Sequence, residues 1–119
     1  MNYKLCDGEY HLMELVWELE PVTSTALYKE CLPRLGWKKS TTYTMLRKLC
    51  ERGLLRNQDS VVTSLIKREA IEHFDSRELV EKRFDCSLPK FIAAFLGEKK
   101  LSKEEASELQ QLIHSCEEK

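Results

Sequence analysis

The stretch of residues 37–55 constrains the fold more than any other part of this chain of 119 residues. Apolar side chains recur in it at helical spacing, which predicts an amphipathic helix over about 39–52. The apolar positions of that helix are Met45, Leu46 and Leu49. Gly53 follows, and glycine is the usual residue for the left-handed conformation that ends a helix. A short apolar run comes next, so the segment reads as a turn, a helix and the start of a strand.

The other face of this helix carries small hydroxyls, a tyrosine and bases. Its outward residues are Ser40, Thr41, Tyr43, Thr44, Arg47 and Lys48. Hydroxyl groups can reach base edges in a DNA groove, and arginine and lysine can hold phosphates. These residue types are typical of a helix that enters the major groove. An ordinary solvated helix is the alternative interpretation of this stretch alone.

The elements on either side give the fold. We expect a helix over about 7–19, ended by Pro21, and a second helix after Val22 that Pro33 stops or kinks. After Gly53, we expect strands over 54–56 and 61–64, joined by a polar turn over 57–60. Three helices followed by a hairpin is the order of a winged helix-turn-helix, in which the third helix enters the major groove and the wing touches the neighbouring backbone.

The last third of the chain reads as three short amphipathic helices, which are too little for a core of their own. We therefore expect their apolar faces to meet a second copy of the chain, and packing onto the first domain in a monomer is the alternative. The sequence predicts a DNA-binding domain over 1–68 and a helical dimerisation region over 69–119. The predicted dimerisation residues are Phe91, Ile92, Phe95, Leu109, Leu112 and Ile113.

Charge is distributed unevenly along the chain, although the whole carries a formal net charge of −1. Residues 34–68 hold nine bases and two acids, a net charge of +7, between two acidic flanks. A local excess of bases indicates a polyanionic partner. The bases predicted to contact phosphates are Lys38, Lys39, Arg47, Lys48 and Arg56. A solvated charged face is the alternative.

Other classes of protein find little support. No apolar run approaches the ~20 residues that span a bilayer, and there is no secretory signal, so we expect a cytoplasmic protein without membrane insertion. No catalytic motif appears around the scattered histidines, which argues against an enzyme. We also expect no cofactor and no metal site.

Five cysteines are present and no two lie close in sequence. Without a C-x-x-C motif, reduced and mostly buried thiols are the expected reading. A redox-sensing thiol is the alternative. Cys50 is its best candidate, because Arg47, Lys48 and Arg52 are expected to lower its pKa.

Several segments resemble the BlaI/MecI/CopY penicillinase-repressor family of winged-helix regulators. The similar segments are Glu9-Tyr10-x-Leu12-Met13-x-x-Val16-Trp17, Thr41-x-x-Thr44-x-Leu46-x-x-Leu49-x-x-x-Gly53-Leu54-Leu55 and Leu101-Ser102-x-x-Glu105-x-x-x-Leu109. The resemblance implies a homodimeric repressor of transcription that sits on a pseudo-palindromic operator. In antibiotic-resistance members, it further implies a membrane sensor protease that cuts the dimerisation helices. The comparable bond here is Ala94–Phe95. Copper-responsive members have a cysteine-rich tail, whereas this chain has only Cys116 there, so copper sensing is not carried over.

The chain also departs from the family pattern. Thr42 stands at a usually apolar position, so we expect weaker packing beneath the third helix. Lys38 and Lys39 replace a usual Ser-Pro pair, Lys48 stands where an arginine is usual, and the hairpin is shorter than the usual wing. Two alternatives on the same fold therefore remain: a module that binds protein, and a thiol- or metal-responsive regulator.

Overall fold

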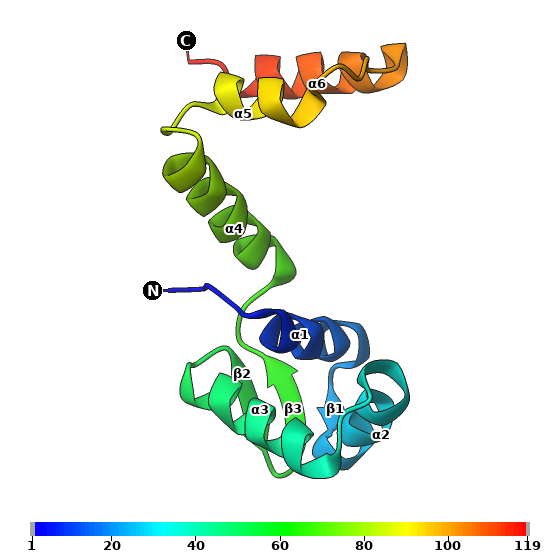
Figure 1. Ribbon diagram of the computed structural model, residues 1–119. Helices are drawn as coiled ribbons and strands as arrows, with labels where there is room; N and C mark the ends of the chain where they lie inside the picture. Colours follow the sequence, from blue (N-terminus) through cyan, green and yellow to red (C-terminus); the bar gives the residue numbers. More distant parts are fainter. Residues whose placement is uncertain (1, 119) are drawn as a thin grey trace. The chain divides into compact units, whose positions relative to one another are not determined.

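The computed structural model describes residues 2–118 (Figure 1). The elements follow in the order α1 (Asp7–Leu19), β1 (Val22–Thr23), α2 (Ser24–Leu35), α3 (Lys39–Glu51), β2 (Leu55–Gln58), β3 (Val61–Ser64), α4 (Arg68–Arg83), α5 (Leu88–Leu96) and α6 (Lys103–Cys116). This order confirms a mainly helical fold with a small sheet, in which a winged helix-turn-helix precedes three further helices. The chain forms two compact units, Met1–Glu78 and Leu79–Lys119.

Side-chain caps mark the start of four of the helices described. The Glu9 carboxylate accepts a hydrogen bond from the Cys6 N–H (3.0 Å) at the start of α1. Hydroxyls cap three further helices, because the side chains of Thr23, Ser87 and Ser102 accept from backbone N–H groups of α2, α5 and α6 at 3.1 Å each. Each cap satisfies a donor that the first helical turn leaves without an intrahelical partner.

Pro33 does not stop α2, which continues to Leu35. The proline lies in the last turn, so it removes only one hydrogen bond close to where the helix would end in any case. The actual end is at Gly36, which has a φ of 70° and donates its N–H to the Leu32 carbonyl (3.0 Å).

The hairpin turn is tighter than the sequence indicates. Asp59 and Ser60 alone form it, both with positive φ (53° and 63°), as in the two-residue turns whose twist suits a hairpin. Asn57 and Gln58, which were predicted to lie in the turn, therefore belong to β2.

A third strand, β1, pairs antiparallel with β3 and was not predicted. The strand order is β1-β3-β2, with Val22 opposite Val62. A strand of only two residues carries no alternation, so its partner far along the chain defines it.

The core lies wholly within the first unit, where α1, α2 and α3 gather round the sheet (Figure 1). Its buried apolar residues are Leu12, Met13, Leu15, Val16, Leu27, Cys31, Leu46, Leu49, Leu54, Leu55, Val62 and Ile71. By contrast, α5 and α6 have no buried residue.

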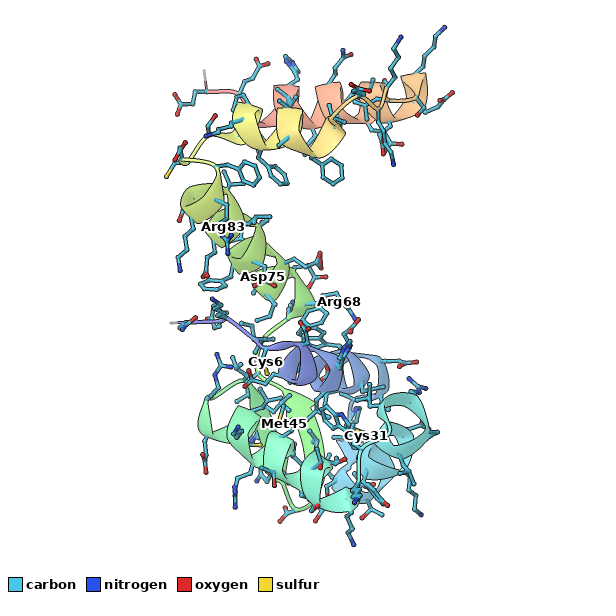
Figure 2. The ribbon with its side chains drawn as sticks, in the orientation of Figure 1. Cys6, Cys31, Met45, Arg68, Asp75 and Arg83 are labelled. Carbon is cyan, nitrogen blue, oxygen red and sulfur yellow. The ribbon has the colours of Figure 1, made fainter. Side chains whose placement is uncertain are left out.

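Polar contacts join the segment that follows β3 to α1. The Trp17 indole N–H donates to the Ile66 carbonyl (2.9 Å), and the Arg68 guanidinium lies 4.9 Å from the Trp17 ring centroid. Figure 2 shows Arg68 at the start of α4, next to α1. These contacts fix where the chain leaves the hairpin and enters α4.

Candidate nucleic-acid interface

The inward face of α3 holds the helix against the core. Thr42, Leu46 and Leu49 are buried at successive turns of the helix. The Thr42 hydroxyl donates to the Lys38 carbonyl (3.2 Å), so the one polar side chain on this face has a partner. Met45, which was predicted to face inward, is half-buried on the side toward Gly8 of α1 (Figure 2).

The outward face of α3 carries nearly all of the predicted DNA-binding residues in exposed positions. These are Lys38, Lys39, Ser40, Thr41, Thr44, Arg47 and Lys48. Because the core faces the opposite side of the helix, their polar groups are free to meet a ligand without any rearrangement of the packing.

Tyr43 differs from its neighbours because it is half-buried. Hydrogen bonds with the side chains of Ser24 and Thr25 lower the pKa of its phenol, and the Lys39 ammonium lies 6.0 Å from its ring centroid. Tyr43 thus braces α3 against the first turn of α2. Its predicted contact with DNA stays a prediction.

Some of the bases in residues 34–68 are already used inside the molecule. Arg34 pairs with Glu18 and Glu30, Arg52 pairs with Glu9 (2.9 Å), and Arg68 pairs with Glu14 (3.7 Å). Arg52 also donates to the backbone carbonyls of residues 2 and 4. The net charge of this stretch is therefore larger than the positive charge that is available to a polyanion.

Within residues 2–118, the other six bases of this stretch are exposed and form no ion pair. One is Lys67, just before α4, and five lie at the N-cap of α3, on α3 and on the hairpin: Lys38, Lys39, Arg47, Lys48 and Arg56. These five were predicted from the sequence as phosphate contacts. They form a basic surface over α3, its N-terminal approach and the hairpin.

Two hollows flank the hairpin. One, of about 430 Å³, lies between α3 and β2 and is lined by Tyr43, Thr44, Leu46, Arg47, Cys50 and Asn57. The other, of about 350 Å³, is lined by Arg56, Gln58, Asp59, Val61 and Thr63. Successive residues of a strand point to opposite faces, so Asn57 and the predicted Arg56 belong to different hollows. Asn57 was not among the predicted site residues, because the sequence pattern places it in the turn and not in β2.

The cysteines differ from expectation. Burial raises the pKa of the Cys50 thiol, the Asn57 backbone lowers it and Glu51 raises it, with a net rise. The prediction that nearby bases lower this pKa is wrong, because Arg52 is turned toward Glu9 and burial dominates. All five thiols are free, and three are exposed (Cys6, Cys86 and Cys116), so the expectation of mostly buried thiols is also wrong.

Residues 2–118 contain no group of three or more His, Cys, Asp or Glu side chains that could hold a metal ion. None of the helices described is long and apolar enough to cross a membrane.

The predicted dimerisation residues line α5 and α6. Ile92, Phe95, Leu112 and Ile113 are exposed, with Phe95 at 75%, and Phe91 and Leu109 are half-buried. The Phe91 ring packs on Phe84 and Phe95, with centroids 5.2 and 6.1 Å apart. Ala94 and Phe95, the predicted cleavage position, both lie exposed within α5.

Comparison with known proteins agrees with this arrangement. The family model described as penicillinase repressor matches residues 5–115. The chain is 25% identical to a penicillinase repressor of Bacillus licheniformis over 114 residues, which cover 92% of this chain and 89% of that protein. It is also 25% identical to an uncharacterised 16.5 kDa protein of Latilactobacillus sakei, over 92% of this chain and 78% of that protein. With a winged helix-turn-helix, a basic third helix and a family match over nearly its whole length, the chain belongs to the penicillinase repressor family and is a transcriptional repressor.

Proposed function

We propose that this protein represses transcription in the cytoplasm by binding, as a homodimer, a pseudo-palindromic operator in double-stranded DNA. The observation that carries the proposal is the set of five exposed bases without ion pairs around α3 and the hairpin. They adjoin exposed hydroxyls on the same helix face. Such a surface offers phosphate contacts for position and polar contacts for base readout.

Each subunit lays α3 into the major groove. Ser40, Thr41 and Thr44, in the N-terminal half of the helix, are the groups that meet base edges. Lys38, Lys39, Arg47 and Lys48 neutralise phosphates, and Arg56 does so from the hairpin. Phosphate contacts of this kind release counterions, so binding weakens as salt rises.

A second copy of the chain covers α5 and α6. Large apolar side chains are left exposed on these helices, and contiguous exposed apolar surface is typical of an interaction site. Joining two copies makes binding of the second half-site intramolecular, which raises affinity for the whole operator without any new contact. Dimerisation is therefore the step at which a signal releases the DNA.

Proteolysis within the dimerisation helices is the proposed signal, with a membrane sensor protease as the partner and antibiotic resistance as the regulated response. This part rests on the family resemblance. The position of Ala94 and Phe95 near the end of the short helix α5 supports it, because a protease must unwind only a few residues to reach their bond. Mass spectrometry of the repressor from cells exposed to a cell-wall antibiotic tests it, and a fragment ending at Ala94 is expected.

Selection of bound DNA from a random pool, at one moderate salt concentration, tests the main proposal. We expect a two-fold symmetric motif with half-sites about one helical turn apart. Enrichment of no sequence, together with binding that does not depend on salt, would overturn it and favour a module that binds protein.

A further inference from the structure

The two hollows beside the hairpin differ in charge. The hollow between α3 and β2 has Arg47 on its lining and no acidic residue. The hollow on the other face of the hairpin has Arg56, but Asp59 lines it as well. An anion that approaches the hairpin is therefore favoured on the α3 side, where the lining carries a net positive charge.

The hollow on the α3 side is continuous with the surface expected to meet DNA. Thr44 and Arg47 line it and also belong to the exposed outward face of α3. In the proposed binding mode, α3 lies in the major groove, so a backbone strand at the edge of that groove would lie near the mouth of the hollow.

The hairpin wall of this hollow is held in place. Leu55 is buried in the core, and Asn57 lies two residues further along β2 on the same face of the strand. Asn57 pairs with Val62, another core residue, and its backbone lies against the Cys50 thiol of α3. Asn57 is nevertheless exposed, so its side chain is open to a ligand from a fixed position.

We propose that the hollow between α3 and β2 seats one backbone phosphate of the DNA, held by Arg47 from the helix and Asn57 from the hairpin. Guanidinium and amide N–H groups are both donors to phosphate oxygens, and the guanidinium adds charge. This inference rests on the proposed DNA-binding function and deepens it, because it adds to Arg56 a second hairpin contact, from Asn57, on the other face of the strand. A contact from two elements to one phosphate fixes the orientation of α3 in the groove.

A matched pair of variants tests the seat. Asn57→Asp and Gln58→Asp each add one negative charge to neighbouring positions of β2, but only the first adds it inside this hollow. DNA binding by the full chain is measured by fluorescence anisotropy over a range of salt concentrations, with circular dichroism to check folding. We expect Asn57→Asp to weaken binding at least about tenfold more than Gln58→Asp, since it repels the phosphate directly. Equal loss in the two variants would overturn the proposal.

A second measurement does not depend on the added charge. Duplexes carrying a neutral methylphosphonate at one backbone position at a time identify each phosphate that contributes to binding. At one phosphate of each half-site, the methylphosphonate should lower the DNA affinity of the unaltered protein and of Gln58→Ala by the same factor. At that position it should lower the DNA affinity of Asn57→Ala by a smaller factor. If every position affects both variants alike, no phosphate is held by Asn57 and the seat is refuted. If the unaltered protein binds no duplex, the proposed function fails and the seat fails with it.

Discussion

The two units of this protein differ in the burial of their apolar side chains. In Met1–Glu78, twelve apolar residues are buried, eleven of them in one cluster, and bases that form no ion pair lie on the outside. In the described part of Leu79–Lys119, no residue is buried, and Phe95, Leu112 and Ile113 are more than half exposed. The first unit encloses its core within one copy of the chain, whereas the second leaves its large apolar side chains exposed. In the function proposed above, the first unit contacts DNA and the second joins two copies of the chain.

Phe95→Asp should have the largest effect on operator affinity, because it disrupts the proposed dimer contact of the second unit and leaves the first unit unchanged. A buried carboxylate at an apolar interface is costly, so the variant should be monomeric. Loss of the linked second half-site should weaken operator binding by a factor on the order of 10²–10⁴. Anisotropy with whole and half operators measures this. A variant that keeps full affinity for the whole operator would show that dimerisation through α5 is not needed.

Leu49→Ala tests the core of the first unit. Leu49 is fully buried in the first unit, so its truncation leaves a cavity and should lower the free energy of unfolding by about 2–5 kcal/mol. Chemical denaturation followed by circular dichroism provides the value. Leu112→Ala is the matched control, since Leu112 is 59% exposed in the single chain. Its effect should appear only at protein concentrations where dimers form.

Lys48→Ala tests which bases of the first unit face DNA. Lys48 is exposed without an ion pair, so its loss should weaken binding to all sequences several-fold and flatten the salt slope by about one unit. Arg34→Ala removes the same charge from a residue paired with Glu18 and Glu30, and should leave the slope unchanged. Thr44→Ala should instead change the preferred sequence. Similar behaviour of the three variants would contradict the proposed roles.

The smallest expected effect is on the stability of the first unit at acidic pH. Burial of Glu9 acts to raise the pKa of its carboxyl, but hydrogen bonds from Cys6 and the pair with Arg52 lower it overall. A lowered folded-state pKa contributes stability above the ordinary glutamate value, and this contribution is lost as pH falls. Between about pH 6 and about pH 3, Glu9→Gln should lose less stability than the unaltered protein. If thermal unfolding gives the same dependence of stability on pH for Glu9→Gln and the unaltered protein, Glu9 does not contribute to acid sensitivity.

Local signals were enough to predict most of the fold. The bounds of α1 follow from apolar spacing and Pro21. The hydroxyls that cap α2, α5 and α6 belong to residues directly before those helices, Thr23, Ser87 and Ser102. Each depends on neighbours within one helical turn. The strand β1 escaped prediction because only its pairing with β3 defines it. The end of β2 was misplaced because Asp59 and Ser60 take positive φ without a glycine.

The candidate site was predictable in residue type but less so in arrangement. The exposed bases of α3 follow from helical spacing alone. The pairing of Arg52 with Glu9, the brace from Tyr43 to α2 and the burial of Cys50 involve residues distant in sequence. Such contacts decide which bases remain available and whether a thiol is reactive, and a local pattern contains no information about them.

Sedimentation equilibrium of the full chain, over a wide range of protein concentrations, measures whether two copies of the chain associate. The account predicts a species of twice the chain mass of 14.0 kDa that dissociates on dilution, because a second copy covers α5 and α6. A mass of one chain at every concentration would contradict the account, since the apolar surface of the second unit would then need a different partner.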